Sequence, residues 1–117
     1  MKREEMIAAV GALNRYIRAN NIADFRLQKV ENGTLHLIGS FDLSYYYDVT
    51  IVITGLTQLS LSCEFYVDLL LSNPFALQFS AEDAAVLRFE DCSIRQQGEI
   101  VFEGGIMFHV KHTVLGD

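Results

Sequence analysis

Three histidines and two cysteines are the side chains of this sequence best suited to chemistry. His109 and His112 are three residues apart, so on one strand they would face opposite sides and could not share a metal ion. His36 lies far from both. Neither Cys63 nor Cys92 belongs to a CxxC pair or to a Cys/His spacing typical of metal sites. The sequence therefore predicts no metal site and no cofactor.

Carboxylates adjoin each other at Glu82-Asp83 and at Glu90-Asp91. Neighbouring residues of a strand point apart, so neither pair forms an acid/base dyad by position alone. No Gly-rich phosphate loop, GxSxG motif or HExxH motif occurs in the sequence. We therefore expect no catalytic residues and a protein that is not an enzyme. A hydrolase-like enzyme that uses one of the two C-terminal histidines is kept as an alternative, because catalytic triads assemble in space.

The charged residues are distributed unevenly along the chain. Residues 1–30 hold six cations and three acids, whereas the rest of the chain holds three cations and twelve acids. No lysine or arginine occurs between Lys29 and Arg88. An acidic surface cannot neutralise phosphates, so we expect no nucleic-acid partner. Two interpretations stay open for this surface, a solvated face that favours solubility and a docking face for a basic partner.

The stretch from Tyr45 to Leu71 has the clearest period in the sequence. Its odd-numbered residues are mostly apolar and its even-numbered residues mostly polar, as expected when side chains alternate between the faces of a strand. Residues 54–58 interrupt the alternation and suit a turn. We expect two long strands at the centre of an antiparallel sheet, with Tyr45 and Cys63 buried. Residues 64–71 could instead be helical, because apolar residues there also recur at a spacing of four.

The even-numbered residues of this stretch predict a binding face. Tyrosine is enriched at interface hot spots, and acids around it would attract a basic partner. The predicted partner-binding residues are Tyr46, Asp48, Glu64, Tyr66 and Asp68. Tyrosine is also common in strands for its β-propensity alone, which is the competing interpretation for each of these aromatic residues.

The N-terminal part of the chain predicts a helix and then a hairpin. Apolar residues recur at helical spacing between Arg3 and Asn20, at Met6, Ile7, Val10, Leu13 and Ile17. Asn32-Gly33 follows and separates two alternating runs, 25–31 and 34–40, which is the strongest short signal for a β-hairpin. A two-residue loop there would set Lys29 opposite His36 and Leu27 opposite Ile38.

The C-terminal part of the chain predicts shorter strands. Ser80 is expected to cap a short helical turn, and Gly104-Gly105 to form a second tight hairpin. Residues 1–117 are thus predicted to form a single α+β domain. Its N-terminal helix packs on a mostly antiparallel, meander-like sheet of about seven or eight strands.

The composition and layout also bear on location and function. The longest apolar run, residues 6–13, is shorter than the ~20 residues that span a membrane. Glu4 and Glu5 are acidic where a signal peptide would have a basic start, so we do not expect a signal peptide. We therefore expect a cytoplasmic protein that contacts no membrane. One helix, hairpin strands and an acidic, aromatic face together resemble, in layout, small bacterial proteins that neutralise toxins or serve as adaptors.

The function that the sequence favours is binding to a protein partner, or to a second copy of the chain, through the acidic, tyrosine-bearing face. The main alternative is a domain that binds a small ligand in a pocket between the helix and the sheet.

Overall fold

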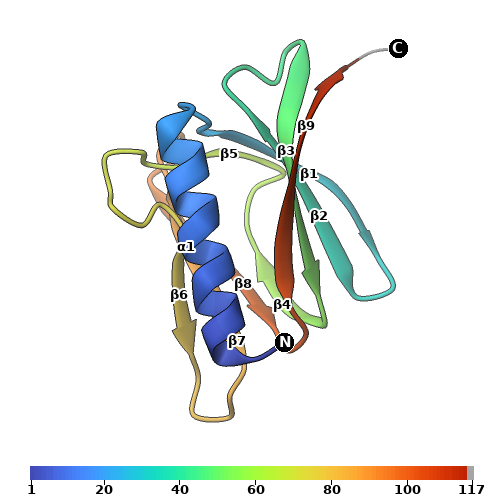
Figure 1. Cartoon of the computed structure of the whole chain (residues 1–117), viewed down its shortest axis with the longest axis vertical. Helices are drawn as coiled ribbons and strands as arrows, with labels where there is room; N and C mark the ends of the chain where they lie inside the picture. The colour runs from blue at the N-terminus through green and yellow to red at the C-terminus, as the bar shows by residue number, and fades with distance from the viewer. Residues whose placement is uncertain (116–117) are drawn as a thin grey trace.

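The structure, a computed structural model, describes residues 1–115, which form one helix and nine strands (Figure 1). The helix is α1 (Arg3–Ala19). The strands are β1 (Asp24–Glu31), β2 (Thr34–Ser40), β3 (Tyr46–Thr54), β4 (Leu56–Ser60), β5 (Glu64–Tyr66), β6 (Ala76–Phe79), β7 (Ala85–Asp91), β8 (Gln96–Phe102) and β9 (Ile106–Val114). The predicted α+β class is confirmed. No helix of residues 1–115 is long and apolar enough to cross a membrane.

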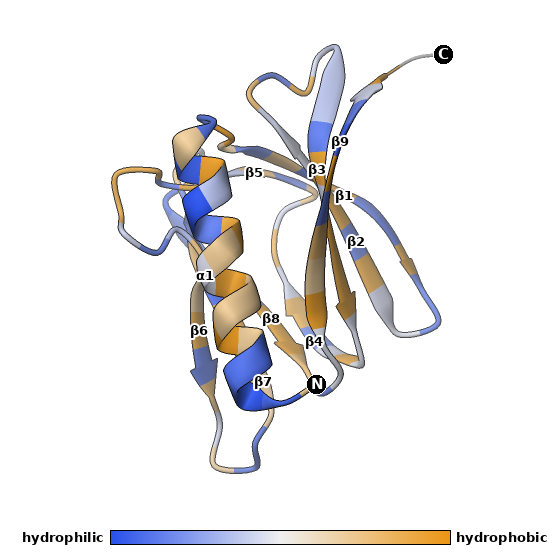
Figure 2. Cartoon of the chain, in the orientation of Figure 1, coloured by the Kyte–Doolittle hydropathy of each residue, from blue (hydrophilic) through white to orange (hydrophobic). Residues whose placement is uncertain are grey.

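The strands form two antiparallel sheets rather than the single meander that the sequence predicted. The first sheet has the order β5-β1-β2-β3-β9, and the second has the order β4-β8-β7-β6. Both sheets and α1 contribute side chains to one core. Figure 2 shows hydrophobic and hydrophilic residues alternating along α1 and along the strands of the first sheet, as expected for elements with one buried side.

A sharp corner joins the two sheets. The pairing of β3 with β9 ends at Ile53 and Ile106, and the pairing of β4 with β8 begins at Leu56 and Phe102. Backbone hydrogen bonds bridge the gap, because Gly104 N donates to Thr54 O at 3.1 Å and Glu103 N donates to Gly55 O at 2.9 Å. The β3–β9 pair of the first sheet therefore continues, through this corner, into the β4–β8 pair of the second sheet.

This corner corrects two predictions. Residues 54–58 do not form a hairpin turn within one sheet, because the strands before and after them, β3 and β4, lie in different sheets. Gly104-Gly105 likewise joins β8 to β9 across the corner and not within a tight hairpin. The long strand predicted after residue 58 is also wrong, since it divides into β4 in one sheet and β5 in the other. Residues 64–71 are not helical, because only Glu64–Tyr66 has regular structure and it is a strand.

The helix packs on the edge strands of both sheets, β9 and β6. Four of its five predicted apolar residues, Met6, Val10, Leu13 and Ile17, are buried, whereas Ile7 is 57% exposed. Asn14 is also buried, and its amide pairs with both backbone groups of Phe75, at 2.9 and 3.0 Å.

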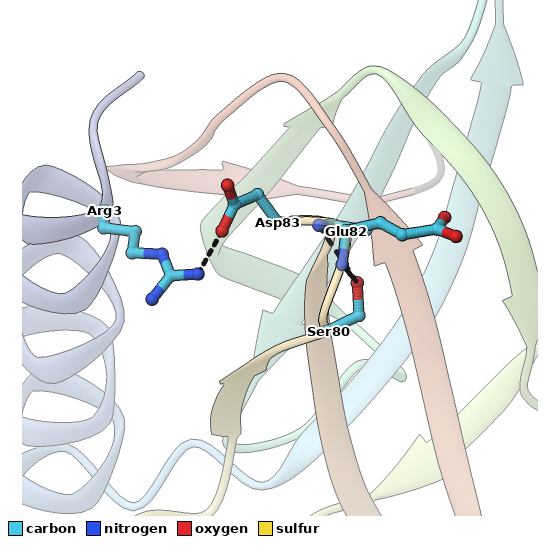
Figure 3. Close-up of polar contacts among 5 residues, drawn as sticks. Arg3, Ser80, Glu82 and Asp83 are labelled. Atoms are coloured by element: carbon cyan, nitrogen blue, oxygen red, sulfur yellow. Dashed lines mark hydrogen bonds and ion pairs between the residues drawn. The ribbon is translucent and has the colours of Figure 1, made fainter.

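The start of α1 is attached to the loop between β6 and β7 (Figure 3). Arg3 forms an ion pair with Asp83, and its guanidinium lies 4.4 Å from the ring centroid of Phe79. Ser80 Oγ accepts the amides of Glu82 and Ala84, but the predicted helical turn is absent at this point of the described chain. Residues 80–84 form instead the β6–β7 turn, with Asp83 at a φ of 65°.

The Asn32-Gly33 hairpin is confirmed. Both residues have positive φ, 52° and 72°, as the tight turn requires, and Lys29 pairs with His36. The register shifts between Leu27 and Lys29, so Leu27 lies opposite Leu37 and not opposite Ile38. The bulge places Leu27 on the same side of the sheet as Leu37, which is buried in the core.

Four phenylalanines hold the first sheet against the second. Phe25 and Phe65 stack with ring centroids 5.6 Å apart, and Phe89 stacks on Phe65 at 4.2 Å. Phe75 packs edge-on against both Phe25 and Phe89. Offset and edge-on packing of this kind is favourable for aromatic rings. The buried side of β5 is therefore fixed by Phe65.

Candidate functional site

The predicted partner-binding residues lie on two strands that are not neighbours. Tyr46 and Asp48 belong to β3, and Glu64 and Tyr66 belong to β5. Two further strands, β1 and β2, lie between β3 and β5, which corresponds to a separation of about 14 Å at the usual strand spacing. Asp48 adjoins the buried Val49, and Glu64 and Tyr66 flank the buried Phe65. Tyr46 has the parity of Asp48 on β3, so all four residues lie on the outer side of the first sheet.

The β3 residues form a group with the adjacent edge strand. His112 Nδ1 lies 2.7 Å from Asp48 Oδ1, and the rings of Tyr46 and His112 have centroids 4.8 Å apart. The pairing between β3 and β9 is irregular between Tyr47 and Val49, which turns His112 toward Asp48. This carboxylate is therefore paired and partly shielded.

The β5 residues form a second group. Glu64 Oε1 lies 3.2 Å from Arg26 Nε on the neighbouring strand, while the side chain of Tyr66 is 47% exposed. Asp68 belongs to the loop after β5, where its Oδ1 accepts the backbone N–H of Leu70 at 2.9 Å. Asp68 therefore stabilises a local turn and does not extend the strand face as predicted.

The segment between β2 and β3, residues 41–45, covers the outer face between the two groups. The N–H of Leu43 donates to Asp24 Oδ2 at 3.0 Å, and Leu43 is buried without joining the main core. Ile38 and Ser40 point to this outer side and are buried as well. Burial raises the pKa of Asp24, and the Leu43 N–H opposes that shift.

Two aromatic residues on this covering segment were missed as site residues. Phe41 is 66% exposed and Tyr45 is 70% exposed, although alternation predicted Tyr45 to be buried. An Asx turn makes the segment irregular, because Asp42 Oδ1 accepts the N–H of Ser44 at 2.9 Å. That hydrogen bond lowers the pKa of Asp42.

These residues define what we call the aromatic–acidic surface. It consists of Phe41, Asp42, Tyr45, Tyr46, Asp48, Glu64 and Tyr66. The covering segment supplies three of them and connects the β3 group to the β5 group. The sequence predicted that the two groups share one face of two long strands; in the structure, residues 41–45 lie between them.

The alternative site between helix and sheet corresponds to a cavity of about 300 Å³ beside α1 and β6. Its lining includes Ile7, Val10, Gly11 and Asn14. Asn14 is the buried polar side chain there, and both of its amide atoms are already bonded to Phe75. The other polar side chains of its lining are those of Asn73 and Gln78.

The histidines and cysteines do not assemble a nucleophile with a base. His112 pairs with Asp48 at the β9 side of the first sheet, while Cys92 lies beside Tyr66 at the β5 side, where its N–H donates to Tyr66 O at 2.9 Å. Cys63 is exposed, so its predicted burial is wrong. Burial, together with acidic neighbours, raises the pKa of Cys92, which disfavours its thiolate. Within residues 1–115, no three His, Cys, Asp or Glu residues are grouped to hold a metal ion.

Comparison with models of protein families, with curated proteins and with solved structures finds no match to this chain.

Proposed function

We propose that this chain is a non-enzymatic domain that binds a basic protein partner through the aromatic–acidic surface. The observation that carries the proposal is the exposure of three large aromatic side chains, Phe41, Tyr45 and Tyr66, around a segment that covers the sheet. Aromatic residues with this exposure, rimmed by acids, are typical of interface anchors.

The charge distribution supports a basic partner over a second copy of the chain. The surface belongs to the interval 30–87, which contains acids and no lysine or arginine. A symmetric contact between two copies would bring this acidic surface against itself, which is unfavourable. A basic partner would instead be attracted over a distance, which speeds association. Such a partner agrees with the resemblance in layout to toxin-neutralising and adaptor proteins.

Site-specific photo-crosslinking in the native cell tests the location of this surface. A photoreactive residue in place of Tyr66 or Tyr45 is expected to capture one basic protein. The matched control is Ile7, which is 57% exposed on α1 and lies outside the surface. Capture of the same protein with equal yield from all three positions would contradict the proposal, as would no capture from either tyrosine position.

Binding kinetics with the captured protein then separate the two roles. Tyr45→Ala and Tyr66→Ala should mainly accelerate dissociation, because most interface substitutions act on that rate. Asp42→Asn should slow association and weaken its dependence on salt. We choose Asp42 because Asp48 and Glu64 already pair with His112 and Arg26. Replacing either of those acids would also leave a neighbouring side chain without its partner. If all three variants have unchanged binding rates and unchanged melting temperatures, these residues are solvated surface without a role in binding, and the proposal is contradicted.

A further inference from the structure

Arg95 has a backbone conformation that its residue type rarely adopts. Its φ is 55°, in the left-handed region, and the other non-glycine residues with positive φ among residues 1–115 are Asn21, Asn32 and Asp83. Asparagine and aspartate are enriched in this region, whereas arginine is not. Residues held in such conformations are concentrated at functional sites. The position therefore indicates that the side chain of Arg95 has a role.

The turn between β7 and β8 places Arg95 at the same end of the second sheet as Glu90. Arg95 N donates to Asp91 O at 2.8 Å, and Glu90 pairs with Gln97 near the start of β8. Both Arg95 and Glu90 are exposed. Within residues 1–115, neither forms an ion pair with the other or with another side chain. The turn thus presents two opposite charges to solvent.

Both residues line a cavity of about 510 Å³ on the outer side of the second sheet. On β7, Glu90 lies between the buried residues Phe89 and Asp91, so its side chain is directed away from the core. The loop before β6, at residues 71–74, contributes another wall. Because Glu90 and Arg95 are exposed, a ligand in this cavity can reach their charged groups from solvent.

The third charged residue of the lining, Arg88, is already neutralised. Its Nε lies 2.8 Å from Glu99 Oε2 on the neighbouring strand β8. The charges that remain at the cavity are therefore one cation, Arg95, and one anion, Glu90. A ligand that complements both must carry a negative and a positive group of its own.

We propose that this cavity binds a free α-amino acid with an aliphatic side chain. The carboxylate of the ligand accepts hydrogen bonds from the Arg95 guanidinium, and its ammonium donates to the Glu90 carboxylate. The amide groups of Asn73 and Gln97 also line the cavity and can pair with the same two groups of the ligand. A peptide fits less well, because at least one further residue separates its ammonium from its carboxylate.

The apolar part of the lining and the volume limit the ligand further. Leu71, Pro74 and Ala76 provide an apolar wall, which suits an aliphatic side chain. At about 30 Å³ for each water-sized group, 510 Å³ accommodates roughly 17 non-hydrogen atoms, so leucine fits and leaves space for water. The cavity shares no residue with the aromatic–acidic surface, so this site does not depend on a protein partner.

The test is a titration of the full chain with L-leucine at about pH 6, where the ammonium is protonated, followed by amide NMR. Saturable shifts are expected at Ala76, Glu90, Arg95 and Gln97. The analogue 4-methylpentanoate lacks the ammonium and leucinamide lacks the carboxylate, and each should bind about tenfold more weakly than leucine. The absence of saturable shifts with leucine, or equal affinity for either analogue, would overturn the proposal.

Variants assign the binding to the two charges. Arg95→Asn removes the cation and suits the positive φ, so it should weaken leucine binding by about tenfold without lowering the melting temperature. Glu90→Gln removes the anion and should weaken binding by about the same factor. Arg15→Gln and Glu103→Gln are the matched controls, since neither residue lines the cavity. Unchanged affinity in Arg95→Asn or in Glu90→Gln would contradict the site, as would equal weakening by the two controls.

Discussion

Gly33 and Gly55 have nearly the same backbone conformation, with φ values of 72° and 70°, but they serve different purposes. Gly33 completes a two-residue turn between β1 and β2, and a Cβ added there would meet no heavy atom within 4 Å. Gly55 lies where the ribbon folds from one sheet into the other. A Cβ added there would lie 2.5 Å from Gly104 N.

The difference separates a local requirement for glycine from a tertiary one. At Gly33 the positive φ alone favours glycine, and the turn determines which residues pair on either side. At Gly55 a second segment of the chain, residues 103–105, occupies the space that a side chain would need. The same signal in the sequence therefore marks a hairpin in one place and a corner between sheets in the other.

The largest effect is expected for Gly55→Ala. Positive φ costs an ordinary residue about 1–2 kcal/mol, and crowding against a hydrogen-bonded backbone should raise the total loss to about 3 kcal/mol. Urea unfolding followed by circular dichroism measures this loss. A loss no greater than that of Gly33→Ala would mean that the corner tolerates a side chain. The proposed difference between the two glycines would then be wrong.

Gly104→Ala isolates the crowding at the same corner. Its Cβ would lie 2.5 Å from Thr54 O, while Gly104 itself does not have a positive φ. Overpacking of this kind costs about 2 kcal/mol. The free energy of unfolding, measured from the same denaturation curves, should therefore fall between those of the Gly55 and Gly33 variants. No measurable loss would show that the Gly104 segment can move away.

Gly33→Ala should have a smaller effect, because only the conformational cost applies. We expect a loss of about 1 kcal/mol, and a smaller loss for Gly33→Asn, since asparagine tolerates the left-handed region. Thermal unfolding of both variants provides the measurement. A loss in Gly33→Asn equal to that in Gly33→Ala would indicate that the turn depends on more than its φ.

Gly11→Ala should change stability least and in the opposite direction. Gly11 is in the interior of α1, and its added Cβ would approach Arg15 Nη1 at 3.4 Å, the end of a flexible side chain. Replacing a helical glycine by alanine gains about 0.8 kcal/mol. A raised melting temperature is the expected result, and a lowered one would mean that α1 packs more closely on β6 than these distances allow.

Elements that depend on residues close in sequence were predicted well. The period of Met6, Val10, Leu13 and Ile17 located α1 to within one residue at its C-terminal end, and Asn32-Gly33 located the first hairpin. The bulge next to Leu27 was not predicted, because no residue there signals it. It is decided by which side chains of β1 must reach the core.

Strand pairing was predicted less well. Alternation continues from residue 58 to residue 66, yet the chain leaves the second sheet after Ser60 and enters the first sheet at Glu64. Alternation indicates that a segment has one apolar side, but it does not name the sheet that covers that side. Cys63 has the parity of Phe65 and is exposed, since it lies in the linker where strand alternation no longer applies.

The candidate surface was predicted in part. The outward direction of Asp48, Glu64 and Tyr66 agrees with alternation, because each adjoins a buried residue of its own strand. Tyr46 shares the parity of Asp48 but has no buried neighbour on β3. Phe41 and Tyr45 belong to the surface only because residues 41–45 fold over the sheet and place Leu43 beside Asp24.

The sequence by itself determined the α+β class, the helix, the first hairpin and the acidic interval without lysine or arginine. These depend on backbone preferences and side-chain periods within a few residues. Only the tertiary structure decided the division into two sheets, the corner at Gly55 and the exposure of Tyr45 and Cys63. Apolar strand faces can pair with many partners, and the choice among them depends on packing between residues that are distant in the chain.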